Sequence, residues 1–168
     1  MVKTFAKGAA AALAFASVPG AAQATMGPDA AACRTGQGRP AILVTVNGFK
    51  ERRGNVRVAL YGSNPRTFLE RGQTVRKIDL PVSQTGPMRI CVAVPEAGRY
   101  AVAVRHDLNG DGRSGWSDGG GFSRNPDISL TSLRPRYENV AVNVGPGVLG
   151  VNVVLNYRFG LSIRPVRG

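Results

Sequence analysis

The chain has few of the residues on which most metal, redox and catalytic centres depend. Its 168 residues include one histidine, two cysteines and one tryptophan, which excludes His-rich and Cys-rich sites. In the mature protein no apolar run reaches the roughly 18 residues that a membrane-spanning helix needs. Acidic residues number ten against 22 Lys and Arg, so the formal net charge is +12. At 43% hydrophobic residues, the composition still predicts one globular domain.

Residues 1–24 have the layout of a secretory signal peptide. Lys3 and Lys7 precede a short apolar stretch, and Ala22-Gln23-Ala24 is a small-residue cleavage site. The stretch is too short to favour the alternative, a lipid-embedded helix. We therefore expect cleavage after Ala24 and a periplasmic or secreted protein without a transmembrane segment. Its formal net charge would be +10, since Lys3 and Lys7 are removed.

The two cysteines are interpreted in the light of this expected export. Cys33 and Cys91 form an even pair in an oxidising compartment, which favours a disulfide over free thiols. Residues 25–40 show no apolar period, so we expect a loose N-terminal arm pinned at Cys33. Cys91 is out of phase with Ile90 and Val92. The disulfide should therefore attach the arm to the outside of a sheet.

After the arm, apolar residues alternate with a period of two, which is typical of half-buried strands. Gly- and Pro-containing turns separate the alternating segments, and no convincing helix appears beyond a single turn within residues 64–71. The pattern predicts an all-β, seven-stranded antiparallel β-sandwich as one domain over residues 41–168. The expected strands centre on residues 42–46, 56–60, 75–80, 90–94, 100–104, 140–144 and 151–155.

Residues 107–118, DLNGDGRSGWSD, match the spacing of a calcium-binding loop. Oxygen-bearing residues occupy positions 1, 3, 5 and 12, and Gly112 at position 6 allows the sharp turn. The strand before the loop and the missing helix after it differ from an EF-hand. The predicted calcium ligands are Asp107, Asn109, Asp111, Arg113 through its carbonyl, and Asp118. The alternative is a hairpin loop whose Asx side chains bond to their own backbone.

The run GRYAVAVRHDLNGDGRSGWSDGGGFSRNP, residues 98–126, resembles the bacterial exported family catalogued as domain of unknown function 2141. GNVRVALY at residues 54–61 and VNVVLNY at residues 151–157 are similar to the family's flanking strands. The resemblance covers about residues 41–157. It implies a transthyretin-like, or prealbumin-like, seven-stranded sandwich that is exported, and it implies no established activity.

These features favour a non-enzymatic binding or structural module of the cell envelope with a calcium-stabilised loop. His106, Trp116 and Phe122 are the candidate recognition surface for an envelope ligand, either an anionic polymer or a carbohydrate. His106 is also in phase with the inward side of its strand, and Trp116 has the alternative role of filling its own loop.

Two other functions remain open. A basic module for anionic polymers fits the net charge, although the arginines are scattered and nucleic acid is disfavoured. A hydrolase is disfavoured by the single histidine and the lack of a G-x-S-x-G motif.

Overall fold

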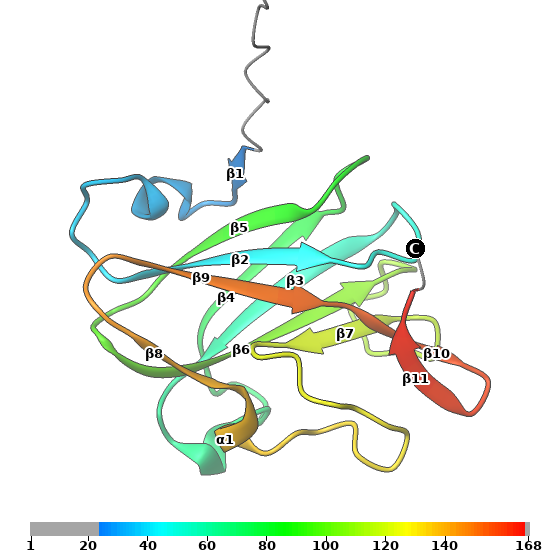
Figure 1. Cartoon of the computed structure of the whole chain (residues 1–168). Helices are drawn as coiled ribbons and strands as arrows, with labels where there is room; N and C mark the ends of the chain where they lie inside the picture. Colours follow the sequence, from blue (N-terminus) through cyan, green and yellow to red (C-terminus); the bar gives the residue numbers. More distant parts are fainter. Residues whose placement is uncertain (1–23, 167–168) are drawn as a thin grey trace, which may run out of the picture.

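The computed structural model describes residues 24–166 and is all-β (Figure 1). Of the expected signal peptide, residues 1–23 lie outside this range. Among the described residues, no helix is long and apolar enough to cross a membrane. The strands are β1 (Thr25–Met26), β2 (Ala41–Asn47), β3 (Asn55–Tyr61), β4 (Thr74–Pro81), β5 (Met88–Ala93), β6 (Gly98–Asp107), β7 (Gly119–Phe122), β8 (Ala141–Val144), β9 (Val148–Val154), β10 (Asn156–Phe159) and β11 (Ser162–Pro165). The short helical elements are η1 (Ala30–Cys33), η2 (Pro65–Thr67) and α1 (Tyr137–Val140).

The strands form two sheets with a shared core. The four-stranded sheet has the order β1-β5-β2-β9, and the seven-stranded sheet has the order β11-β10-β7-β6-β3-β4 with β8 also paired to β6. The prediction of a purely antiparallel arrangement is wrong, because β9 runs parallel to β2 and β1 runs parallel to β5. The chain crosses from β8 to β9 through residues 145–147, which brings β9 alongside β2 in the same direction.

All seven predicted strands are present, as β2, β3, β4, β5, β6, β8 and β9. The strand expected at 140–144 begins one residue later, because Val140 ends α1. The single turn expected within residues 64–71 is the 3-10 helix η2. Strands β1, β7, β10 and β11 were not predicted. They have two to four residues each, and none contains three alternating apolar residues such as Val140, Val142 and Val144 at β8.

The main core lies between the sheets and is made of the apolar residues that alternate along their strands. Val44 of β2, Val58 of β3, Val102 of β6 and Val153 of β9 are almost completely buried in it. A second apolar cluster lies on the other face of the seven-stranded sheet, where residues near η2 and α1 cover it. The segments near η2 and α1 thus cover one end of this outer face. The other end, beside residues 107–118, is left uncovered.

The N-terminal arm is held more firmly than the sequence predicts. β1 pairs with β5, and Asp29 accepts hydrogen bonds from Arg76 Nε at 2.9 Å and from the Ala93 N–H at 3.1 Å. Burial alone would raise the pKa of Asp29, but these hydrogen bonds outweigh it and leave the pKa below its ordinary value. The expectation of a loose arm is therefore wrong, because an ion pair and a strand pairing hold it in addition to the cysteine.

The disulfide is confirmed between Cys33 of η1 and Cys91 of β5. Cys91 has no exposed surface, yet it is not part of the core between the sheets. Its side chain lies on the opposite face of β5 from Ile90 and Val92, beneath the arm. The predicted attachment of the arm to the outside of a sheet is thus confirmed.

Candidate functional site

His106 lies near the end of β6 with no exposed surface, so the predicted inward orientation is confirmed. Its Nε2 is 2.8 Å from the Arg53 carbonyl and must donate, because a carbonyl only accepts. Nδ1, 2.6 Å from Tyr157 Oη, therefore accepts the phenol proton. Phe49 packs edge-on against the imidazole at 5.5 Å. Both ring nitrogens are engaged inside the protein, so the assignment of His106 to the recognition surface is wrong.

The loop after β6 is held by two aspartates that bind its own backbone. The two carboxylate oxygens of Asp107 accept from the N–H groups of Gly110 at 2.9 Å and Gly112 at 2.8 Å. Asp118 accepts from the Leu108 N–H at 3.1 Å with one oxygen and from the Gly115 N–H at 2.9 Å with the other. Asp118 therefore joins the beginning of the loop to its end.

The middle of the loop is held in the same way. Asp111 accepts from the Arg113 N–H at 2.7 Å and from the Asn109 side-chain amide at 2.8 Å. The hydrogen bond from the Arg113 N–H, followed by that from Asn109, lowers the pKa of Asp111 below its ordinary value. Gly112 has a φ of 75°, which fits the sharp turn expected of position 6.

The hydrogen bonds of the predicted calcium ligands correspond to the Asx-hairpin alternative. The carboxylates of Asp107, Asp111 and Asp118 each accept from backbone N–H groups of the loop. Within residues 24–166 no group of three or more His, Cys, Asp or Glu side chains is arranged to hold a metal ion. The three carboxylates and one amide still form an oxygen donor set of the chemical kind that calcium prefers, so calcium binding by the loop stays a prediction.

The glycines of β7 shape both faces of the sheet beside the loop. A Cβ atom on Gly119 would overlap the Tyr157 ring, and one on Gly121 would lie 2.6 Å from the Val154 carbonyl oxygen. These two positions face the interior, where only glycine fits. Gly120 faces outward, and a Cβ there would have no contact closer than 3.7 Å, to the Val104 carbonyl oxygen. The outer surface over β7 is therefore low and open.

A groove of about 360 Å³ lies over this part of the seven-stranded sheet. Its floor is formed by small residues of three adjacent strands, Ala59, Ala103 and Gly120. Larger side chains from β3, β6, β7 and the loop form its walls, among them Arg57, Arg105, Tyr61, Phe122, Ser114 and Asp118.

A second hollow of about 200 Å³ adjoins the groove and shares Gly115, Asp118, Gly120 and Phe122 with it. Trp116 lines this hollow, is 75% exposed, and stacks against the Arg158 guanidinium at 3.7 Å. The structure therefore brings Trp116 and Phe122 to one surface, as the sequence predicts, while His106 lies on the other side of the sheet.

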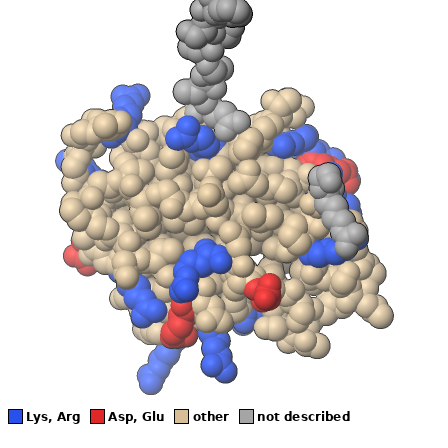
Figure 2. All heavy atoms as spheres, in the orientation of Figure 1, with Lys and Arg blue, Asp and Glu red and all other residues tan. Residues whose placement is uncertain are grey.

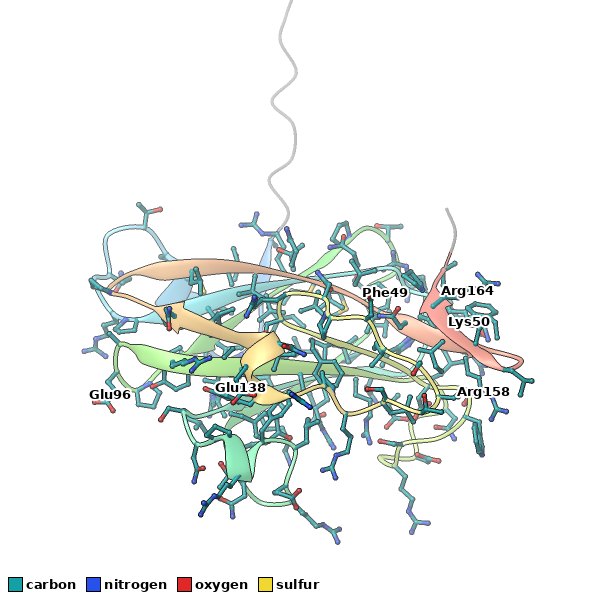
Figure 3. The ribbon with its side chains drawn as sticks, turned by 60° about the horizontal axis from the view of Figure 1, so that its bottom comes forward. Phe49, Lys50, Glu96, Glu138, Arg158 and Arg164 are labelled. Atoms are coloured by element: carbon teal, nitrogen blue, oxygen red, sulfur yellow. A yellow bond between two sulfur atoms is a disulfide. The ribbon has the colours of Figure 1, made fainter. Side chains whose placement is uncertain are left out.

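Basic and aromatic side chains gather around the β10–β11 hairpin, which the sequence does not reveal. Figure 3 shows Phe49, Lys50, Arg158 and Arg164 at this end of the molecule, with Glu96 at the opposite end. Lys50 and Arg164 both contact the Phe159 ring, at 5.4 and 4.2 Å. On the face seen in Figure 2, Lys and Arg are scattered and form no single large patch. These basic and aromatic residues come from distant segments of the chain, so residues that are scattered in the sequence lie together at this end.

Other residues of the site could be recognised only in part from the sequence. Arg105 is out of phase with Val102 and Val104, which does place it on the outer face of β6. The pairing of Tyr157 with His106 spans 51 residues and has no local signal. Ser123, directly after β7, accepts from the Val102 N–H at 3.0 Å and donates to the Val140 carbonyl, which ties β6 to the end of α1.

Comparison with known proteins agrees with the resemblance of the loop and its flanking strands. No curated protein and no solved structure matches the chain, so the transthyretin-like relationship stays a prediction. A family model described as an uncharacterised protein conserved in bacteria, domain of unknown function 2141, matches residues 44–151. This range runs from β2 to β9 and includes the loop and the groove. The chain therefore belongs to the bacterial family known as domain of unknown function 2141.

Proposed function

We propose that the protein is an exported, non-enzymatic binding module of the cell envelope, and that it binds its ligand in the groove over β7. The observation that carries this proposal is the groove itself, about 360 Å³ with a floor of small residues and walls of aromatic and charged side chains. Binding sites for small molecules typically occupy such concave, mostly apolar surfaces with a few polar groups. The adjoining hollow at Trp116 would extend the same surface.

A binding role without catalysis is supported by the position of His106. It is the only histidine of the chain, and both of its ring nitrogens bond to protein groups in the interior. General-base catalysis requires hydrogen-bonding distance to the substrate, whereas this histidine has no exposed surface.

The ligand surface is tested by filling the groove from its floor. Gly120→Trp places an indole on the outward side of β7, where the space above the backbone is open. Gly150→Trp is the matched control, because Gly150 lies in β9 of the other sheet and a Cβ there has no neighbour within 4 Å. Retention is measured on immobilised peptidoglycan, lipopolysaccharide and secreted polysaccharide, after circular dichroism confirms the fold.

The wild-type protein and Gly150→Trp should be retained on at least one of these polymers, whereas Gly120→Trp should be lost from it. Equal retention of both variants would refute the groove as the binding surface. Absence of retention for the wild-type protein on all three polymers would refute envelope binding. Export is tested separately, by showing that the periplasmic or secreted form begins at Thr25.

We further propose that calcium stabilises the loop at residues 107–118. The donor set of Asp107, Asn109, Asp111 and Asp118 supports this, although the carboxylates would have to exchange backbone partners for the ion. Calcium would then raise the melting temperature of the chelator-treated protein, and Asp111→Asn would weaken that response. No bound metal and no shift in melting temperature would leave the loop held by its own N–H groups alone.

A second candidate function, binding of an anionic envelope polymer, is favoured by the cations at the β10–β11 hairpin. Lys50, Arg52, Arg158 and Arg164 each pack on an aromatic ring, and none has a carboxylate partner among the described residues. Stacking limits the motion of a guanidinium while leaving its edge free to donate. Arg164→Gln should elute earlier than Arg99→Gln from heparin if this end binds polyanions, and equal elution would count against it.

A further inference from the structure

Two arginines lie directly opposite each other at one end of the groove. Arg57 of β3 and Arg105 of β6 are paired in register on adjacent antiparallel strands, with Asp79 of β4 beyond Arg57 and Gly120 of β7 beyond Arg105. All four residues therefore form one row across the outer face of the sheet. Like charges directly opposite on neighbouring strands destabilise a sheet, so negative charge beside these two arginines would stabilise the row.

The protein supplies a close carboxylate partner to Arg57 but only a distant one to Arg105. Asp79 binds Arg57 closely, with its carboxylate 2.6 Å from Nε and 3.3 Å from a terminal nitrogen. Arg105 has weaker partners: Asp107 at 3.4 Å, whose carboxylate is already engaged by two glycine N–H groups, and Ser114 Oγ at 3.4 Å.

The Nε of Arg105 is moreover buried without any hydrogen-bond partner among the described residues. Buried polar groups of a folded protein are seldom left unpaired. Arg105 lines the groove and its terminal nitrogens have only these two contacts of 3.4 Å within residues 24–166, so its donors are poorly satisfied, which points to an acceptor supplied by a ligand. A carboxylate suits this position, because its two oxygens match the planar fork of donors on a guanidinium.

The rest of the groove suits a sugar ring. Ala59, Ala103 and Gly120 leave a low apolar floor beside the aromatic side chains of Tyr61 and Phe122. Ser114 and Asp118 stand at the loop side of the groove, where their oxygens can bind hydroxyl groups. Asp118 already accepts from the Leu108 and Gly115 N–H groups, and Ser114 accepts from Arg105. Each oxygen keeps a further lone pair for a ligand hydroxyl, which a purely aromatic acid lacks.

We propose that the groove binds a sugar acid, with its carboxylate at Arg105 and Arg57 and its ring over the small-residue floor. This inference rests on the proposed function, since it names the chemistry of the ligand for the same groove. A free uronic acid and a uronic acid unit at the end of a polymer present the same carboxylate and ring, so either could occupy the groove.

The test uses the full mature chain labelled with ¹⁵N and three probes: glucuronate, glucose and benzoate. Glucuronate should shift the Arg105 Nε–H signal and bind at least tenfold more tightly than glucose, which lacks the carboxylate, and benzoate, which lacks hydroxyls. Arg105→Gln should weaken glucuronate binding at least tenfold. Arg57→Gln should also weaken it, which keeps the proposal testable if Arg105→Gln fails to fold. Arg99→Gln, on the same strand but outside the groove, should stay within twofold of wild type.

Equal binding of glucose and glucuronate would overturn the sugar-acid assignment while leaving a sugar-binding groove intact. Tighter binding of benzoate than glucuronate would overturn the sugar and keep the carboxylate contact as a different ligand class. No shift with any probe would overturn the inference, whereas the retention experiment with Gly120→Trp decides the proposed function independently. The affinity of glucuronate is then compared with that of an oligouronate. A higher affinity for the oligouronate would identify a polymer as the source of the ligand, and an equal affinity would identify a free sugar acid.

Discussion

The phenol of Tyr157 donates a hydrogen bond of 2.6 Å to Nδ1 of His106 in the interior of the sandwich. The contact joins β10 to β6, and the other nitrogen of the imidazole continues it to the Arg53 carbonyl in the loop before β3. Both side chains are almost completely buried. A polar connection thus fixes the end of the sandwich from which the loop at residues 107–118 departs.

Removal of this hydrogen bond should cost stability. Tyr157→Phe leaves Nδ1 of a buried imidazole without a donor, which should lower the free energy of unfolding by about 1–3 kcal/mol in urea denaturation. Tyr137→Phe is the matched control, because its buried hydroxyl has no hydrogen-bond partner among the described residues. That variant should be neutral or slightly more stable. Equal losses in both variants would show that the contact with His106 contributes nothing specific.

Stability should fall at alkaline pH through the same tyrosine. Burial raises the pKa of Tyr157 to about 12, whereas an unfolded tyrosine titrates near its ordinary value of about 10. Between these values the unfolded chain has lost a proton that the folded chain keeps, so the free energy of unfolding falls by up to about 1.4 kcal/mol per pH unit. The stabilisation linked to protonated Tyr157 is fully present below a pH of about 10. Tyr157→Phe should show a shallower alkaline decline, and an identical decline would contradict the assignment.

The glycines of β7 should differ in their tolerance of a methyl group. Gly121→Ala would place a Cβ 2.6 Å from the Val154 carbonyl oxygen and 2.7 Å from Val153 Cγ1. Such overpacking against a backbone should cost about 1–3 kcal/mol of unfolding free energy. Gly120→Ala, one residue away but facing outward, should change it by less than about 0.5 kcal/mol. The thermal midpoints of the two variants compared with wild type test this difference, which would be refuted by equal values.

Loss of the disulfide should destabilise the whole domain rather than the arm alone. Cys33 and Cys91 are separated by 58 residues, and closing a loop of that size contributes about 4 kcal/mol in the chain-entropy model. A Cys33→Ser/Cys91→Ser variant should therefore unfold at markedly lower urea concentration. Wild-type protein with dithiothreitol should approach the same midpoint. An unchanged midpoint would mean that β1 and the Asp29–Arg76 pair alone hold the arm.

The sequence was most informative where one face of a strand is buried. Alternating apolar residues identify seven of the strands, and the phase of Cys91 and His106 predicts which way each side chain points. This succeeds because a period of two is a local property of a strand.

Features set by distant contacts could not be predicted in this way. β7 has the sequence GGGF, in which Gly119 and Gly121 are required by Tyr157 and Val153 from another part of the chain. The groove likewise depends on the register that places Arg57 opposite Arg105. In the loop, the spacing of aspartates is shared by a calcium site and by a set of Asx turns, and the hydrogen bonds of the structure follow the second pattern.

Amide shift mapping tests the central claim, that the groove over β7 is the ligand-binding surface, most directly. The ¹⁵N-labelled mature chain is titrated with soluble fragments of acidic and neutral envelope polysaccharides, and each perturbed amide is assigned. We predict shifts in residues 57–61, 101–105 and 114–122, which surround the groove. Shifts confined to the outer face of the four-stranded sheet, at residues 43–45 and 150–152, would contradict the account.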